Sequence, residues 1–360
     1  MKIVIAGGGT GGHLYPGIAV AREIIKDGGE VLFIGTGRGI EARVLPKEGL
    51  TLRTIRAGRL KGTGLVERIK TLAGIPLGII EARKVLKEFG PDAVMGVGGY
   101  ASFPAVAAAK TLGLPVLLQE QNAYPGLTNR TLGKVADKVA LGFAEADRFF
   151  PKGKSVFTGN PVRQLSVSDK AEALKFFGLE EGRTTVLAFG GSGGAHTINK
   201  GMTDALSYLA DLKDSVQFIH QTGQRDFETV EAAYKASGFT ARVSAFIYEM
   251  DKAYACAGLA VCRSGALTLA ELAALGKPAL LIPYPFAADN HQEVNARTLE
   301  SAGAAKVLTD REATGQRLAQ EIKSLLSDRK ALGIMAEKSG SIGRPDAARA
   351  VYEVLRKLIS

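Results

Sequence analysis

The sequence predicts an α/β protein with two doubly wound, Rossmann-like domains and a cleft between them. Short aliphatic runs alternate with longer helical stretches along all 360 residues, which is typical of parallel sheets covered by helices. The chain is also too long for one ordinary core. Its halves repeat one pattern, because KIVIAGGGTGGH at the start returns as TTVLAFGGSGGAH in the second half. We therefore expect one nucleotide-binding unit used twice.

Ten aliphatic runs are predicted to be strands, five in each half. Stretches such as 17–28 and 267–275 follow helical spacing and are predicted to be helices between them. The predicted strands are 2–7, 30–35, 93–98, 115–119 and 138–143, then 184–190, 215–221, 241–246, 259–262 and 278–284.

The domain boundary is predicted at SVFTGNPVRQ (155–164), where Gly-Asn-Pro marks a non-helical connection. We expect an N-terminal domain over 1–160 and a C-terminal domain over 161–342. The last segment, 343–360, has a proline near a helix start and continues amphipathically. It either packs on the C-terminal domain or crosses back to the N-terminal one.

Charge is distributed unevenly between the halves. Residues 1–160 carry 22 Lys and Arg against 13 Asp and Glu, whereas 161–360 carry 24 against 23. This predicts that the N-terminal domain meets an anionic surface or substrate. We expect no nucleic acid, because the chain has no recognition-helix, zinc-finger or RNP-type pattern.

The chain's start and its two cysteines indicate a cytoplasmic setting. MKIVIAGGG predicts a buried strand and not a signal peptide, and no apolar run approaches the ~18 residues of a membrane span. Cys256 and Cys262 lie in YACAGLAVC and are expected to be reduced, buried thiols.

Three glycine-rich turns follow predicted strands, at 7–12, 96–99 and 190–194. Glycine lets the backbone approach a phosphate, and a following helix offers free N–H groups. The first turn fits G-x-G-x-x-G, yet the second strand ends in GTGR (35–38) without the acid that binds ribose in dinucleotide sites. We therefore disfavour NAD or FAD, expect no cofactor, and predict several anion sites at one crevice.

Seven motifs occur in one order along the chain, and they are GGTGGH (8–13), GVGGYASFP (96–104), QEQNAYPG (119–126), GNPVR (159–163), GGSGGA (190–195), CRSGALTLAELAALGKPALLIPYP (262–285) and DNHQ (289–292). Together they resemble the MurG family of peptidoglycan glycosyltransferases, over essentially the whole chain. The resemblance implies a GT-B type fold and an inverting, metal-independent hexosyltransferase. Its activity would be transfer of N-acetylglucosamine from UDP-GlcNAc to undecaprenyl-pyrophosphoryl-MurNAc-pentapeptide, converting lipid I to lipid II. The acceptor would bind the N-terminal domain and the donor the C-terminal domain.

Metal independence is also supported by the residues themselves. The chain has no Asp-x-Asp, the pair that holds Mg²⁺ or Mn²⁺ in metal-dependent sugar transferases, and its four histidines are not at ligand spacing. A leaving diphosphate would then be met by helix N-termini, backbone N–H groups, hydroxyls and arginine. A UDP-sugar epimerase, a transferase for another glycolipid and a non-enzymatic sugar-nucleotide binder remain alternatives.

His13 and Glu120 are the catalytic candidates. His13 follows the first glycine turn at a helix start, where a neutral imidazole can act as general base toward the acceptor hydroxyl. A capping histidine is the alternative. Glu120, in QEQN, is a rival base or a partner of His13, unless it is a buried acid paired with an arginine.

The resemblance also implies the substrate-binding residues. Glu271 would accept hydrogen bonds from the ribose hydroxyls, Ser192 would meet the donor phosphate, and the Ile247 backbone amide would read the uracil edge. His291 stands where some members of the family carry a glutamine. The other donor-binding candidates are Thr10, Gly11, Gly12, Asn122, Arg163, Ala266, Leu267, Thr268, Leu269, Ala270 and Gln292, and the acceptor-side candidates are Gly9, Gly98, Gly99 and Tyr100.

Residues 51–90 are basic and apolar in alternation, with nine Lys and Arg against three acids. Such a stretch suits peripheral binding to anionic lipid, here the cytoplasmic face of the plasma membrane. An ordinary amphipathic helix with a buried face is the alternative. The residues are Arg53, Arg56, Arg59, Lys61, Arg68, Lys70, Arg83, Lys84 and Lys87, with Leu65, Val66, Ile69, Leu72, Ile75, Leu77, Ile79 and Ile80.

Overall fold

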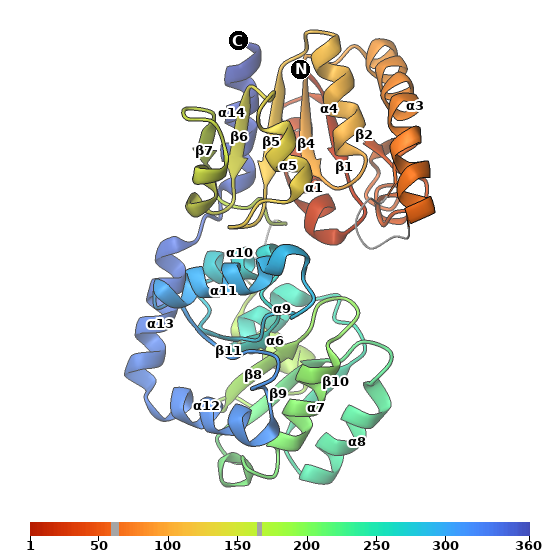
Figure 1. Ribbon diagram of the computed structural model, residues 1–360. Coiled ribbons are helices and arrows are strands. Elements are labelled where there is room, and N and C mark those ends of the chain that lie inside the picture. The colour runs from red at the N-terminus through yellow and green to blue at the C-terminus, as the bar shows by residue number, and fades with distance from the viewer. Residues whose placement is uncertain (59–64, 164–167) are drawn as a thin grey trace. The chain divides into compact units, whose positions relative to one another are not determined.

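The structure is a computed structural model that describes residues 1–58, 65–163 and 168–360, without the side chains of 65–73. The chain divides into two compact units, each built on one parallel sheet (Figure 1). Unit 1 is Met1–Gln164 with Arg344–Ser360, and unit 2 is Leu165–Gly343.

Unit 1 has a seven-stranded sheet in the order β3-β2-β1-β4-β5-β6-β7, and its strand pairs are parallel. The strands are β1 Lys2–Gly7, β2 Glu30–Gly35, β3 Thr51–Thr54, β4 Ala93–Gly98, β5 Val116–Glu120, β6 Lys138–Leu141 and β7 Ser155–Phe157. The helices are α1 Gly11–Lys26, α2 Glu41–Val44, α3 Leu65–Phe89, α4 Ser102–Thr111, α5 Leu127–Leu132 and α14 Ala347–Ile359.

Alternation along β1 explains why this sheet is buried on both faces. Ile3 and Ile5 enter one hydrophobic cluster, whereas Val4 and Ala6 enter another, because successive strand residues point to opposite faces. The first cluster also contains Val351 of α14.

The C-terminal helix α14 crosses back to unit 1, which decides between the two expectations for this segment. It packs against α1, and Nη1 of Arg349 donates to the Asp27 carboxylate at 2.8 Å. In Figure 1 it is the blue helix in the same unit as the red N-terminal strand.

Unit 2 has a six-stranded parallel sheet in the order β10-β9-β8-β11-β12-β13, which repeats the winding of β3-β2-β1-β4-β5-β6. The internal repeat expected from the sequence is therefore present in the fold. The strands are β8 Thr184–Phe189, β9 Val216–Gln221, β10 Ala241–Ser244, β11 Ala257–Cys262, β12 Ala279–Leu281 and β13 Ala305–Val307. The helices are α6 Lys170–Phe177, α7 His196–Ala205, α8 Phe227–Ser237, α9 Met250–Cys256, α10 Ala266–Ala274, α11 His291–Ser301, α12 Gly315–Ser327 and α13 Arg329–Ile342.

All ten predicted strands are present, and three further strands were missed. Those three, β3, β7 and β13, each lie at a sheet edge and have three or four residues; the remaining edge strand, β10, is as short as β3 but was predicted within 241–246. An edge strand has one neighbour and needs no long aliphatic run, so its sequence signal is weak. Cys256 and Cys262 are both free and buried, as expected.

Candidate active site

The first two glycine turns touch each other in unit 1, where the neighbouring strands β1 and β4 end. A methyl group at Gly99 would lie 2.2 Å from the carbonyl oxygen of Gly8, so these backbones pack without side chains between them. The Tyr100 ring lies against Gly9, where an added Cβ would be 3.4 Å from Cε2 of the tyrosine. The structure thus brings the predicted acceptor-side residues together.

Glu41 is a residue of this site that the sequence interpretation missed. Its buried carboxylate accepts from the amide of Gly9 at 2.8 Å, and from the amide and hydroxyl of Thr36 at 2.9 and 2.8 Å. Burial alone would raise the pKa of Glu41, but these hydrogen bonds hold it below its ordinary value. One amide of the first turn is therefore already bonded to a carboxylate of the chain itself. In the sequence, the only indication of this role was an acidic residue a few positions after the second strand.

His13 lies in the first turn of α1, against the second glycine turn. Its Nδ1 is 3.0 Å from Oε1 of Gln121, and a methyl group at Gly98 would come within 2.9 Å of the same Nδ1. Gly98 has a φ of +89°, so a side chain there would be both strained and too close to the imidazole. The ring is held between Gly98 and Gln121.

Glu120 ends β5 and is almost fully buried. Its carboxylate accepts from the Asn122 amide at 2.9 Å, the Asn122 side chain at 3.3 Å, the Gly126 amide at 3.2 Å and the Asn129 side chain at 3.0 Å. Burial raises the pKa of Glu120, and these hydrogen bonds oppose the rise. The carboxylate is thus bonded to amides, and it organises the loop that carries Asn122.

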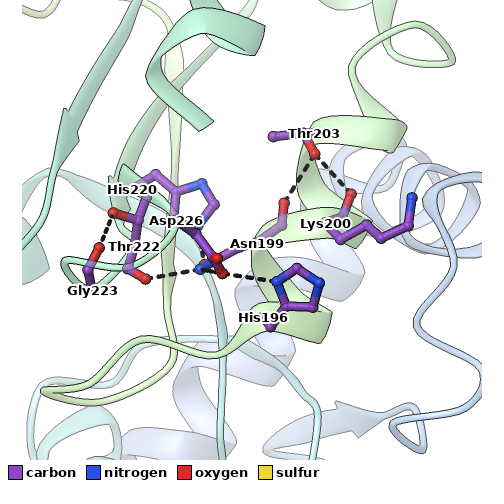
Figure 2. A network of polar contacts seen from close by, with 8 residues as sticks. All are labelled: His196, Asn199, Lys200, Thr203, His220, Thr222, Gly223 and Asp226. Atoms are coloured by element: carbon purple, nitrogen blue, oxygen red, sulfur yellow. Dashed lines mark hydrogen bonds and ion pairs between the residues drawn. The ribbon is translucent and has the colours of Figure 1, made fainter. Parts of the chain in front are cut away.

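The third glycine turn leads into α7 of unit 2 and packs on the loop after β9. A methyl group at Gly194 would overlap the carbonyl oxygen of Thr222. Figure 2 shows the network behind this contact, in which the Asn199 side chain donates at 2.8 Å to both the Thr222 carbonyl and the Asp226 carboxylate. Nδ1 of His196 lies 3.0 Å from the same carboxylate. The network anchors the start of α7, while Ser192 itself is exposed.

His220 is a fully buried member of this network. Its Nε2 lies 3.1 Å from Oδ1 of Asn199, and its Nδ1 lies 3.2 Å from the Tyr234 hydroxyl. Burial lowers the pKa of His220 to about 3, so this imidazole is neutral near pH 7.

Gln221, at the end of β9, joins the third glycine turn to the segment with Ile247. Its Nε2 donates to the Gly191 carbonyl at 2.9 Å, and its Oε1 accepts from the Ile247 amide at 2.9 Å. The amide that was predicted to read uracil is therefore bonded to Gln221 in this structure. Phe246 and Tyr248 flank Ile247 as an exposed, edge-on aromatic pair.

Glu271 lies within α10, which begins just after the RSG segment (263–265), and Gln292 lies in the first turn of α11. The carboxylate of Glu271 accepts from the Tyr254 hydroxyl at 2.8 Å. Ser264, just before the helix, donates to the backbone carbonyl of Gln292 at 2.8 Å. The start of α10, with Ala266, Leu267, Thr268, Leu269 and Ala270, therefore lies close to the DNHQ segment.

The DNHQ segment is strained just before Gln292. Asp289 and Asn290 both have a φ of +55°, a region that residues other than glycine rarely occupy. His291 then begins α11, with its Nδ1 2.7 Å from the Ala288 carbonyl oxygen. Such strain is often kept at ligand sites.

Arg163 is exposed at the end of unit 1, whereas Ser192 belongs to unit 2. The predicted donor residues are thus divided, with Thr10, Gly11, Gly12 and Asn122 also in unit 1. Among the residues that the structure describes, no group of histidine, cysteine, aspartate and glutamate is arranged to hold a metal ion.

Helix α3 carries most of the described part of the basic and apolar stretch, whereas Arg53 lies in β3 and Arg56 shortly after it. Leu77 is 46% exposed and Ile80 is 64% exposed, whereas Ile79 packs on the core. Ile80 lines a shallow groove with Arg83, Lys84, Lys87 and Glu88. In the described part of the chain, no helix is both long and apolar enough to cross a bilayer. Eight residues of the predicted stretch lie outside the described side chains: Arg59, Lys61, Leu65, Val66, Arg68, Ile69, Lys70 and Leu72.

Comparison with known proteins identifies the family and the fold of the chain. The glycosyltransferase family 28 N-terminal domain matches residues 3–141, and the family's C-terminal domain matches residues 185–351. The crystal structure of Acinetobacter baumannii MurG has a TM-score of 0.81 at 32% identity, covering 99% of both chains. A UDP-GlcNAc 2-epimerase from Neisseria meningitidis, at 16% identity and a TM-score of 0.68, shares the fold.

Two curated relatives match nearly the whole length of the chain. Both are UDP-N-acetylglucosamine–N-acetylmuramyl-(pentapeptide) pyrophosphoryl-undecaprenol N-acetylglucosamine transferases. The one from Myxococcus xanthus is 48% identical over 98% of this chain and 92% of its own length. The one from Geobacter sulfurreducens is 48% identical over 98% and 97%. The two sheets have the GT-B fold, and the chain belongs to the MurG group of glycosyltransferase family 28.

Proposed function

We propose that this enzyme transfers N-acetylglucosamine from UDP-GlcNAc to undecaprenyl-pyrophosphoryl-MurNAc-pentapeptide, and so forms lipid II for peptidoglycan. The observation that carries the proposal is the 48% identity, over 98% of the chain, with transferases named for this reaction. The basic excess of residues 1–160 supports an anionic acceptor on unit 1.

The proposed chemistry is one displacement that inverts the sugar's anomeric carbon. A hydroxyl oxygen of the acceptor sugar bonds to C1 of GlcNAc while the bond from C1 to the diphosphate oxygen breaks, and its electron pair leaves with UDP. His13 accepts the hydroxyl proton, and its place beside the glycine turns of unit 1 supports that role. Glu120, bonded to four amide groups, holds the neighbouring loop in place.

The donor is proposed to bind unit 2. Glu271 would accept from the ribose hydroxyls, and Gln292, near the start of α10, would contact the sugar. The N–H groups at the start of α7, together with Ser192, would stabilise the departing diphosphate. That arrangement needs no metal ion.

The direct test is incubation of the purified enzyme with radiolabelled UDP-GlcNAc and the lipid-linked acceptor. We expect one UDP released for each GlcNAc that appears on the acceptor, with no loss in EDTA. A reaction of UDP-GlcNAc alone to its 2-epimer would instead identify an epimerase, the activity named for a structure of similar fold.

The base is tested by His13→Gln. Turnover should fall by about 10²–10⁴-fold with UDP binding nearly intact, because the group removed acts on the acceptor. Near-normal turnover would contradict the assignment.

We further propose that α3 binds the cytoplasmic face of the plasma membrane, without crossing it. Exposed Ile80 and Leu77 stand beside Arg83, Lys84 and Lys87, a combination that suits anionic headgroups. Ile80→Ser should weaken binding to vesicles that contain anionic lipid. Ile25→Ser is the matched control, since Ile25 is 42% exposed on α1 of the same unit. Equal binding by both variants and the parent would refute the role of α3.

A further inference from the structure

Three buried carboxamide side chains stand in a row behind His13. Gln119 and Gln121 come from β5 and the residue beyond its end, and Asn160 comes from the segment that follows β7. The three side chains have no role in the chemistry proposed above. Asn160 belongs to the Gly-Asn-Pro motif, which was interpreted from the sequence only as a connection between domains. Buried carboxamides are costly unless their donors and acceptors are all oriented toward partners, so their orientations carry information.

The row begins with Asn160, whose orientation is set by the main chain. Its Nδ2 donates to the backbone carbonyl of Gln121 at 2.8 Å, so its Oδ1 must face the other way. That oxygen accepts from Nε2 of Gln119 at 3.1 Å. The remaining atom of the Gln119 amide, Oε1, consequently accepts from Nε2 of Gln121.

Two backbone carbonyls also fix the orientation of the Gln121 side chain, independently of the Asn160 and Gln119 side chains. Its Nε2 donates to the backbone carbonyls of Val97 at 2.9 Å and of Gln119 at 3.1 Å. A carbonyl oxygen can only accept, so the amide nitrogen must point to these two atoms. Oε1 of Gln121 is therefore the atom that faces Nδ1 of His13, at 3.0 Å.

An amide oxygen cannot donate, so the hydrogen of this contact must come from the imidazole. We infer that Gln121, oriented by Gln119 and Asn160, is a positioning residue that keeps the hydrogen of neutral His13 on Nδ1 and the lone pair on Nε2. The inference rests on the proposed role of His13 as the base. With this tautomer, Nε2 takes up the acceptor proton while the bond from Nδ1 to Gln121 persists in the imidazolium.

The same contacts also fix the ring in space. Gly98 faces Nδ1 from the other side, where a methyl group would come within 2.9 Å. The orienting group is neutral, unlike the aspartate that orients histidine in hydrolase triads. Gln121 thus selects the nitrogen and the direction of the proton transfer without placing a charge beside the ring.

The tautomer can be measured directly by ¹⁵N NMR on protein labelled at histidine, at a pH above the imidazole titration. The His13 signals are assigned by their loss in His13→Gln. We expect the hydrogen on Nδ1 in the parent enzyme. A His13 that carries it mainly on Nε2 would overturn the inference.

Gln121→Met removes the acceptor at nearly constant side-chain length. We expect the hydrogen to redistribute toward Nε2 and kcat to fall by about 10- to 100-fold, with KM for UDP-GlcNAc little changed. Retention of both the Nδ1 hydrogen and the parent kcat would contradict the inference. If this variant does not fold, the tautomer of the parent enzyme decides the question.

Gln217→Met is the matched control. Gln217 is also buried, donates to the Glu180 carbonyl at 2.9 Å and the Thr185 hydroxyl at 3.1 Å, and accepts from the Glu180 amide at 2.9 Å. It lies in unit 2 at the start of β9, so its loss should lower stability while kcat and the His13 tautomer stay as in the parent. A similar loss of kcat in both variants would show that general destabilisation, and not positioning, explains the effect.

The experiments can refute the proposed role of His13 as the base and the proposed positioning role of Gln121 independently of each other. Normal turnover of His13→Gln would refute the base, while the tautomer would still test Gln121. An inactive His13→Gln together with hydrogen on Nε2 would refute the positioning role and leave the base in place.

Discussion

Replacing Gln221 by methionine should uncouple the third glycine turn from the segment with Ile247, which the family resemblance predicts to contact the diphosphate and the uracil. Gln221 is buried at the end of β9, and both polar atoms of its side chain are used. They bind the Gly191 carbonyl and the Ile247 amide, each at 2.9 Å. Methionine keeps the length of the side chain and removes both hydrogen bonds.

The magnitude follows from those two contacts. A net contribution of about 0.5–1.5 kcal/mol for each hydrogen bond predicts a loss of about 1–3 kcal/mol in the free energy of unfolding. For a unit of this size, that lowers Tm by roughly 2–4 °C per kcal/mol. A comparable loss of preorganisation, about 1.4 kcal/mol, would raise the Kd for UDP tenfold.

Calorimetry measures both quantities, Kd by titration with UDP and Tm by scanning. Gln217→Met serves as the control. Gln217 lies on the same strand and this variant also loses buried side-chain hydrogen bonds, but at the start of β9, opposite to the end that carries Gln221. We expect both variants to lose stability and only Gln221→Met to lose UDP affinity. Unchanged affinity in a destabilised Gln221→Met would refute the coupling.

Three further predictions concern Glu271, Glu41 and His220. Glu271→Ala should raise the Kd for UDP by about 10- to 100-fold in the same titration, and an unchanged Kd would count against the ribose role. Glu41→Gln should lower the free energy of unfolding at pH 7 by about 1–3 kcal/mol, since a donor replaces an acceptor. The pKa of Glu41 is depressed in the folded state, so the parent's advantage should fade as pH falls through that pKa in urea titrations; an advantage that persisted in acid would contradict this. Burial lowers the pKa of His220 to about 3 against ~6.5 when unfolded, so the unfolded chain binds the extra proton. The free energy of unfolding should then fall by about 1.6 kcal/mol from pH 6.5 to 5, and His220→Gln should abolish most of that dependence.

Much of the fold could be predicted because its signals are local. Aliphatic runs between helical patterns marked ten strands, and the repeated glycine turn marked the second copy of the unit. The edge strands β3, β7 and β13 were missed because three or four residues with one neighbour leave little pattern, whereas the equally short edge strand β10 was found within the longer stretch 241–246. The return of α14 to unit 1 was open in the sequence, since an amphipathic helix shows that it has a buried face but not which core will cover it.

The candidate site, like the fold, was predictable from the sequence only in part. By itself the sequence determined the glycine turns, His13 and the family, because contiguous motifs carry them. Only the tertiary structure decided that Glu41 bonds to the first turn, that Gln121 orients His13, and that Gln221 joins two loops of unit 2. The physical reason is that a carboxylate or carboxamide acquires its role from the donors and acceptors around it. Those partners lie up to 108 residues away along the chain, as between His13 and Gln121, and meet only when the sheet forms.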